Sequence, residues 1–307
     1  EIPKRDWSSD VCSSDLAAVQ PDGRVTLTTG SVDIGGGRAT LAMQLAETLG
    51  IAYEDVTARV GDTDSIGFTH VTGGSRTTFA TGWAVWDAAH DIMSQLEERA
   101  ARIWEVDRTR VRYEDGGVSG PDGKRFTFKE IAAQLPHTGG QIQGHAASNK
   151  STHGASFACH IADVEVDIAT GKVNILRYTA IQDVGTAIHP SYVEGQIQGG
   201  AAQGIGMALT EEYFYDDNGV MRNSSLLDYR MPTTLDLPML DTHLIQVPNP
   251  GHPLGVRGVG EPPIVPVLGA ISNAIYDAIG IRYRALPATP TVILDGILDR
   301  QEAGGSR

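Results

Sequence analysis

The hydrophobic and polar positions of the chain follow two periods, and each period predicts one kind of element. Residues 25–28 alternate apolar and polar side chains, as a strand with one buried face does. Three leucines then recur every four residues up to Leu49 and are followed by Gly50, which is typical of a helix that ends at a glycine. The stretch 30–37 between them is glycine-rich. We therefore expect the order strand, glycine loop, helix.

The same order is predicted a second time. A β-rich stretch over 56–60 precedes a polar glycine loop over 61–78, and apolar residues at helical spacing follow from Val85 to Ile103. Residues 110–160 are rich in Gly, His, Gln and Ser, which indicates mostly loop with short strands.

The second half of the chain predicts a hairpin and two helices. Strict alternation over 164–168, a turn at 169–172 and a β-rich run over 173–178 are typical of a β-hairpin. Helices are expected over 191–212 and, as the last element, over 265–280. Strands and helices in this mixed order indicate an α+β fold with mixed sheets and packed helices.

The predicted helix over 191–212 contains five glycines, each of which costs roughly 1 kcal/mol relative to alanine in a helix interior. They are Gly195, Gly199, Gly200, Gly204 and Gly206. Glycine allows close approach to the backbone, so either another helix or a ligand is expected to lie against this one. Packing of another helix is the favoured explanation, and a bound ligand remains the alternative.

The domain boundaries are expected to divide the chain into five segments. Residues 1–16 contain Ser-Ser-Asp twice and no apolar period, so they are expected to be foreign or disordered. The others are a first region over 17–110, a loop-rich connection over 111–160, a second region over 161–300 and a tail over 301–307.

Composition excludes several classes of protein. Lys and Arg number 24 against 38 Asp and Glu, a net charge of −14, which disfavours nucleic acid or an anionic membrane as partner. No apolar run approaches the ~20 residues of a membrane span. The two cysteines, Cys12 and Cys159, are too far apart in sequence to indicate an iron–sulfur or zinc site.

One acidic residue, Glu261, has the surroundings of a general base. It follows a glycine-rich loop over 255–260, precedes two prolines that fix the chain direction, and lies just before a predicted helix whose N-terminus favours negative charge. A glutamate at a helix start is more often a capping or solvent-facing residue. The sequence pattern alone therefore favours that role over the role of a general base.

Two loops, 33–37 and 73–77, could bind an anion through backbone N–H groups. Neither has the glycine spacing of a Rossmann or P-loop motif, and ordinary turns explain them equally well.

Six motifs occur together in a fixed order. They are Asp33-Ile-Gly35 with Gly37 and Thr40, Gly61-Asp-Thr-Asp64 before Gly74-Ser75, residues 183–190, residues 194–206, Asp228-Tyr229, and Gly258-Val-Gly-Glu261. In this order they resemble the molybdenum-binding subunit of the xanthine dehydrogenase, aldehyde oxidase and carbon monoxide dehydrogenase family. The resemblance covers residues 17–296 and only the C-terminal part of that much longer subunit.

The resemblance implies a molybdenum hydroxylase of the aldehyde- or N-heterocycle-oxidising kind. Glu261 matches the glutamate that takes a proton from a molybdenum-bound hydroxyl; that oxygen then attacks the substrate carbon, and hydride passes to a sulfido ligand. The fold implied is the second molybdopterin-binding region of the large subunit.

The cofactor implied is molybdopterin cytosine dinucleotide, held largely by backbone N–H groups and amide side chains. Its contacts are expected at Gly35, Gly36, Gly37, Gly74, Ser75, Asp183, Gly185, Gln196, Gln203, Arg257, Gly258, Val259 and Gly260. The pterin dithiolene holds the metal, so no protein ligand to molybdenum is expected. Many relatives have Gln where this chain has Gly36, so one pterin contact is missing or supplied elsewhere.

The implied partners are an iron–sulfur subunit, an FAD subunit, a small-molecule substrate and the missing N-terminal half of the same subunit, without which this chain is expected to be inactive. The cytoplasm is the default compartment, with the periplasm also open. A non-catalytic cofactor-binding or assembly module of the same fold is the main alternative. A serine or metal hydrolase is a third possibility, disfavoured by the absence of G-x-S-x-G.

Overall fold

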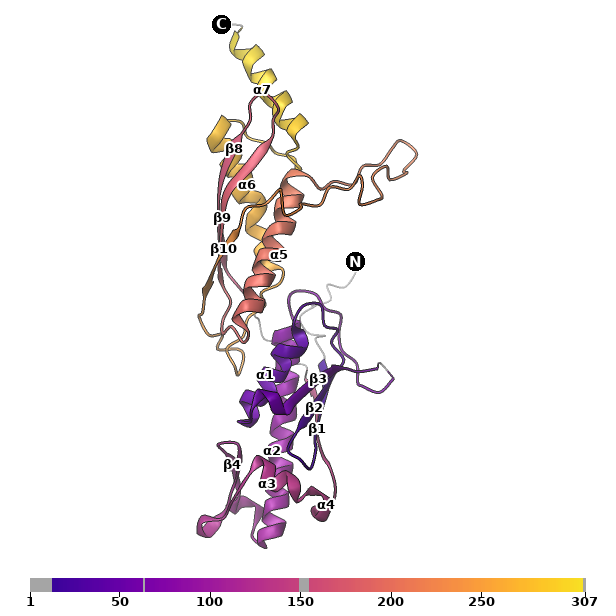
Figure 1. Cartoon of the computed structure of the whole chain (residues 1–307), viewed down its shortest axis with the longest axis vertical. Helices are drawn as coiled ribbons and strands as arrows, with labels where there is room; N and C mark the ends of the chain where they lie inside the picture. Colours follow the sequence, from indigo (N-terminus) through magenta and orange to yellow (C-terminus); the bar gives the residue numbers. More distant parts are fainter. Residues whose placement is uncertain (1–12, 63, 149–154, 306–307) are drawn as a thin grey trace, which may run out of the picture. The chain divides into compact units, whose positions relative to one another are not determined.

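The structure, a computed structural model, consists of two compact units (Figure 1). It describes residues 13–62, 64–148 and 155–305. Unit 1 comprises the chain up to Ala155 together with Pro248–Gly258, and unit 2 comprises Ser156–Val247 and the chain from Val259 onward. Each unit has its own hydrophobic core and is described by itself.

Unit 1 is built on a mixed four-stranded sheet in the order β3-β2-β1-β7. Its strands are β1 (Ser13–Val19), β2 (Val25–Thr29), β3 (Val56–Val60) and β7 (Ile142–Ser148). β1 runs antiparallel to both β2 and β7, and β2 runs parallel to β3. A small antiparallel sheet adds β4 (Arg112–Glu114), β5 (Gly117–Ser119) and β6 (Arg125–Thr127).

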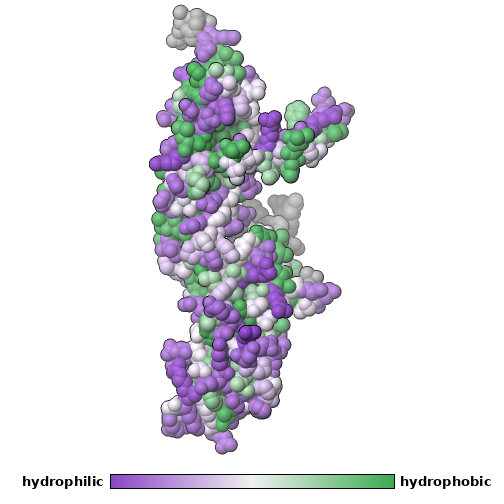
Figure 2. Space-filling model, viewed as in Figure 1, coloured by the Kyte–Doolittle hydropathy of each residue, from purple (hydrophilic) through white to green (hydrophobic). Residues whose placement is uncertain are grey.

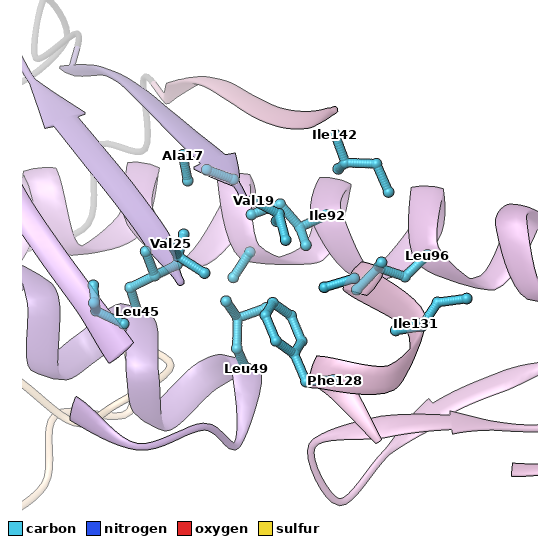
Figure 3. Close-up of a cluster of buried hydrophobic side chains, with 14 of the residues drawn as sticks. Ala17, Val19, Val25, Leu45, Leu49, Ile92, Leu96, Phe128, Ile131 and Ile142 are labelled. Atoms are coloured by element: carbon cyan, nitrogen blue, oxygen red, sulfur yellow. The ribbon is translucent and has the colours of Figure 1, made fainter. Parts of the chain in front are cut away.

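Helices enclose the core of unit 1: α1 (Gly37–Leu49), α2 (Gly82–Trp104), α3 (Phe128–Ala133) and α4 (Leu135–Thr138), with a π-helical turn η2 (Thr77–Thr81) directly before α2. α1 and α2 pack on the main sheet, and α3 packs on α2 and the small sheet. The long α2 packs on β1, β7 and α1. Figure 3 shows how side chains from the strands and helices meet, among them Val19, Leu49, Ile92 and Phe128.

Unit 2 packs two helices against a mixed three-stranded sheet. Its elements are β8 (Ala158–Val166), β9 (Val173–Asp183), α5 (Pro190–Leu209), β10 (Leu240–Ile245), η5 (Pro262–Ile264), α6 (Val265–Ile279) and α7 (Pro290–Gly305). β8 and β9 form the predicted antiparallel hairpin, and β10 adds to β9 in parallel. α6 packs on β8, and α5 packs on α6. The α+β class with mixed sheets and packed helices is confirmed.

Three glycines of α5 lie where other parts of unit 2 touch the helix. A Cβ at Gly204 would lie 2.6 Å from the Val267 Cβ, and one at Gly200 would lie 2.9 Å from the Pro263 side chain. Gly206 is crowded by Glu211 and Pro232. By contrast, Gly195 and Gly199 meet no described atom outside their own stretch of helix within 4 Å. Packing therefore explains three glycines, and two remain on an open face.

Several boundaries differ from those expected. β1 begins at Ser13, so the ordered strand starts four residues before Ala17, because residues 13–16 pair with β7 and Asp15 and Leu16 pair with β2 as well. Residues 111–148 are part of unit 1 and carry its small sheet, and are not merely a connection. The helix over 265–279 is not the last, since α7 follows and covers most of the expected tail.

No described helix combines the length and the apolar character that crossing a membrane requires.

Exchanging single glycines of α5 for alanine distinguishes the packed face from the open one. We expect Gly204→Ala to lower the free energy of unfolding by about 1–3 kcal/mol, because the new methyl group overlaps Val267. The matched change Gly195→Ala, on the open face of the same helix, is expected to raise it by about 0.5–1 kcal/mol through helix propensity. Urea unfolding of both variants measures this, and equal shifts would contradict it.

Candidate functional site

Three loops of unit 1 that carry predicted cofactor contacts lie together. The loop before α1 reaches the loop before η2, where a Cβ at Gly37 would be 3.8 Å from the Thr77 methyl group. Thr40 and Gln44 of α1 extend this contact, and the Gln44 side-chain amide donates to the Thr78 carbonyl at 3.2 Å. The third loop, Pro248–Gly258, reaches the same place from far along the chain.

The loop at residues 33–37 is closed by the carboxylate of Asp33. This carboxylate accepts hydrogen bonds from the Gly37 N–H at 2.8 Å and the Gly35 N–H at 3.3 Å, and it pairs with Arg38 at 2.7 Å. The Arg38 hydrogen bond, with the Gly37 and Gly35 N–H groups, holds the pKa of Asp33 below its usual range. An anion arriving at this loop therefore has to compete with Asp33 for these two N–H groups.

The loop at Gly74 and Ser75 has a backbone that ordinary residues seldom adopt. Gly74 and Ser75 both have positive φ, 66° and 55°. No described atom lies within 4 Å of a Cβ position at Gly73 or Gly74, so the loop is open there. On its other side Gly258 touches it: a Cβ at Gly258 would lie 2.8 Å from both the Cβ and the carbonyl oxygen of Ser75. Only glycine at position 258 permits this approach.

The segment Pro248–Gly258 is a loop that hydrogen-bonds to itself. The buried Asn249 donates through its N–H to the Gly255 carbonyl at 2.9 Å and through its side-chain amide to the Val256 carbonyl at 3.1 Å. Arg257 donates to the Ala155 carbonyl. These hydrogen bonds therefore fix the backbone of the loop that carries Arg257 and Gly258.

A histidine that sequence reasoning missed joins this loop to the rest of unit 1. His252 is 4% exposed, and its Nε2 lies 3.1 Å from the Phe79 carbonyl oxygen in η2. Its Nδ1 accepts the Leu254 N–H at 3.1 Å. The ring packs against Phe79 and Trp83, and burial lowers its pKa to about 4 against the opposing effect of the Phe79 bond. The Gly- and Pro-rich context of His252 in the sequence gave no signal of this.

A buried carboxyl group supports the same region. Asp15 in β1 is 2% exposed and pairs in register with Thr29. Burial raises its pKa to about 7, against a Thr29 hydrogen bond and the charge of Arg76, which lower it. Asp15 belongs to the stretch that the sequence pattern excluded from the fold, so no sequence signal pointed to it.

In unit 2 the residues predicted from the 183–190 motif form the end of β9. Asp183 accepts hydrogen bonds from the Gly185 N–H at 3.1 Å and the Val247 N–H at 3.3 Å, so its carboxylate holds the turn after β9. The Val184 N–H donates to the Ile245 carbonyl at 2.9 Å. The turn leads directly into α5, whose first residue is Pro190.

Glu261 lies beside α5 at the start of η5. Its side chain is exposed, and the two prolines and the helix α6 follow it as the sequence predicts. The loop before it crosses α5 at Gly200, where a Cβ would be 3.4 Å from the Gly260 carbonyl oxygen. Gln196 and Gln203 lie about one turn of α5 to either side of this crossing. Unit 2 therefore brings the predicted base close to both predicted amide contacts along one helix.

Among the described residues, neither a metal-binding group nor the cavity of unit 2 involves the predicted site residues. No three His, Cys, Asp or Glu side chains among them group as a metal site requires. The cavity of about 620 Å³ in unit 2 is lined by β9, the end of α5 and residues 226–238, and contains none of the predicted contacts. Cys159 is a free, exposed thiol, while Cys12 lies outside the described residues.

Known proteins resemble this chain over most of its length. The family model of the molybdopterin cofactor-binding domain matches residues 6–238. The xanthine dehydrogenase molybdenum-binding subunit of Escherichia coli O157:H7 is 34% identical over 278 residues, and the nicotine 6-hydroxylase large subunit of Paenarthrobacter nicotinovorans is 33% identical over 306 residues. These matches cover 88% and 94% of this chain.

A solved structure gives the same result for the fold. Reconstituted CO dehydrogenase from Oligotropha carboxidovorans matches with a TM-score of 0.86 and 27% identity over 95% of this chain. The chain spans only 37% and 38% of the two relatives' lengths and 38% of the matched chain of that structure.

The pH dependence of stability is expected to report on Asp15. The unfolded carboxyl group loses its proton near pH 3.8, whereas the folded one keeps it to about pH 7, so the free energy of unfolding falls as pH rises between these values. The full loss is roughly 4 kcal/mol. Urea unfolding at pH 5 and pH 7.5 should show this fall in the wild type and a smaller one in Asp15→Asn; equal pH slopes would refute the assignment.

Proposed function

The chain belongs to the molybdopterin cofactor-binding domain family, and on that premise we propose that it is part of the catalytic large subunit of a molybdenum hydroxylase. The substrate class proposed is an aldehyde or an N-heterocycle, with water as the oxygen source. Relatives named for xanthine and for nicotine support the heterocyclic choice. Glu261 is the observation that carries the proposal, because it is an exposed carboxylate presented by a rigid Gly-and-Pro segment at a helix start.

The loops of unit 1 fit a cofactor bound through its phosphates and pterin. Gly73 and Gly74 leave open space where side chains would otherwise stand, and Gly258 and Arg257 line the adjoining loop. In unit 2 the open face of α5 offers Gly195 and Gly199 beside Gln196 and Gln203. Glycine backbone and amide side chains are suited to a polar, multiply hydrogen-bonding ligand. We propose its cytosine dinucleotide form.

The chemistry divides between the cofactor and this chain. When bound, the cofactor supplies the molybdenum centre that accepts two electrons from the substrate. Glu261 takes the proton of the attacking oxygen nucleophile on a carboxylate oxygen. Its backbone position is held by Pro262 and Pro263 on one side and by the Gly260 contact with Gly200 on the other. A base held in this way contributes typically 10² to 10⁴ in rate.

The partners proposed are an iron–sulfur subunit, an FAD subunit and the upstream part of the same large subunit. Large hydrophobic side chains exposed on the segment 210–239 support the last of these. They are Tyr213, Phe214, Tyr215, Val220, Leu226, Leu227, Met231, Leu235 and Met239. Part of the segment extends away from the rest of unit 2, and hydrophobic and polar residues are mixed on its surface (Figures 1 and 2). Residues from 226–238 also line the cavity beside β9 and α5.

Polar bonds order this segment without an apolar core of its own. Asp216 accepts from the Asn218 and Val220 N–H groups, and Tyr229 donates to Glu211 at 2.8 Å. A shaped segment with this much exposed apolar surface marks an interaction site. The matched relatives' remaining length, more than half of each, is the part of the subunit that we propose to cover it.

Replacing Glu261 tests the catalytic proposal against the non-catalytic alternative. In the full-length subunit purified with its partners, we expect Glu261→Gln to lower turnover by about 10²- to 10⁴-fold, because the amide cannot take a proton. Molybdenum and released cytidine nucleotide should remain at wild-type content. Steady-state kinetics and metal analysis measure the two effects.

The control for this variant is Glu165→Gln, which changes an exposed carboxylate of β8 in the same unit. It is expected to leave turnover unchanged. Wild-type turnover in Glu261→Gln would favour the cofactor-binding or assembly module. Turnover without any electron acceptor would instead favour a hydrolase.

Acidic substitutions test the segment 210–239 as an interaction site. Leu226 and Leu227 are 79% and 88% exposed, so we expect Leu226→Asp with Leu227→Asp to leave the unfolding midpoint of this chain unchanged. The same pair should lower the yield of assembled full-length subunit severalfold. Leu176→Asp, at another exposed apolar position, is the control. Unchanged assembly in the double variant would contradict the proposal.

A further inference from the structure

The two loops of unit 1 proposed to hold the cofactor are 73–77 and 255–258, and they come from distant parts of the chain. Backbone contact between Gly258 and Ser75 places them together. A further link between them is the ring of His252, which lies just before residues 255–258 and bonds to the helical turn that follows the other loop.

The hydrogen bonds of His252 fix the ring in one neutral tautomer. A neutral imidazole has one donor and one acceptor. The Phe79 carbonyl can only accept, so Nε2 carries the proton, and Nδ1 is left to accept the Leu254 N–H. One ring nitrogen therefore closes the loop around residues 252–254, while the other ties that loop to η2.

The carbonyl that His252 binds lies in a π-helical turn. Phe79 is in η2, four residues after Ser75, and α2 begins at Gly82. Phe79 and Trp83 also pack their rings around His252, with ring centroids 5.2 and 5.6 Å away. Movement of the His252 ring would therefore displace the base of the 73–77 loop together with the 255–258 loop.

We infer that His252 is a positioning residue that ties the Arg257–Gly258 loop to the Gly74–Ser75 loop, so that both form one preorganised wall for the proposed cofactor. Only the part of this inference that concerns the cofactor rests on the proposed function. The structural tie between the two loops stands on the contacts of unit 1 alone. Preorganisation matters because each loop that must be ordered on binding lowers affinity.

Two substitutions separate the two bonds of the ring. The Asn side chain places its oxygen near the position of Nδ1, so His252→Asn keeps the local turn and loses the bond to Phe79. The Gln amide reaches the position of Nε2, so His252→Gln keeps a donor for the Phe79 carbonyl. His160→Gln is the matched control, because His160 is also buried, at 9% exposed, and has a pKa lowered to about 4, but lies in unit 2 against Tyr178.

Hydrogen exchange of the full chain tests the tie without cofactor. In His252→Asn we expect amide exchange in 73–77 and 254–258 to rise about tenfold, the effect of losing one net hydrogen bond, with no change in the α2 core around Ile92. His252→Gln should stay within about threefold of wild type, and His160→Gln should leave both loops unchanged. Unchanged exchange in His252→Asn, or an equal rise throughout unit 1, would overturn the inference.

The assembled enzyme tests the role of His252 in holding the cofactor separately. We expect the His252→Asn complex to lose molybdenum and nucleotide on gel filtration several times faster than wild type, and His252→Gln to restore retention. Equal retention in all three would overturn the positioning role and leave the proposed function standing. A wild-type complex without cofactor would defeat the proposed function, and the exchange data would then decide the structural tie.

Discussion

The backbone contact between Gly258 and Ser75 is the constraint on which the candidate site depends. A side chain at position 258 would overlap the Ser75 Cβ and carbonyl oxygen, so glycine is required. Directly after Gly258 the chain enters the second unit, where Val259 packs on the other hydrophobic core. Only Val259 and Gly260 separate Gly258 from Glu261 in the sequence.

The loops of the candidate site are held by hydrogen bonds from polar side chains to backbone groups, and two of these side chains, Asn249 and His252, are buried. Asn249 and His252 satisfy backbone groups inside the Pro248–Gly258 segment, and Asp33 and Asp183 do the same in their turns. Loss of a hydrogen bond from the buried Asn249 or His252 leaves a buried polar group unpaired. Single polar substitutions there are therefore expected to alter loop geometry while the two helix–sheet cores remain intact.

The sequence predicted the elements with strong periodicity. The leucine repeat of α1, the β8–β9 hairpin and the apolar spacing of α2, α5 and α6 all appear in the structure within a few residues. The mixed character of the two larger sheets comes from β1, β7 and β10, which the sequence pattern did not place. Motif order also predicted the family correctly, because six short motifs in register are far more specific than any single one. The local hydrophobic pattern was sufficient to predict an element wherever one face of that element is buried.

The rest depended on long-range contacts that leave little local trace. β1 includes polar residues at 13–15, and its pairing with β2 and β7 is set by tertiary structure. α7 buries little beyond Ile293 and Ile297. His252 sits in a Gly- and Pro-rich loop whose partner, Phe79, lies far back in the chain.

The five glycines of α5, which are unfavourable in a helix interior, have two different explanations, close packing and ligand binding. Gly200, Gly204 and Gly206 admit neighbours of unit 2, and this close packing offsets their loss of helix propensity. Gly195 and Gly199 have no such neighbour among the described residues, so folding of this chain alone gives no reason for them. Gln196 and Gln203 flank the same region, and amides next to bare backbone suit a polar ligand. The two explanations that the sequence left open therefore both apply, on different faces of one helix.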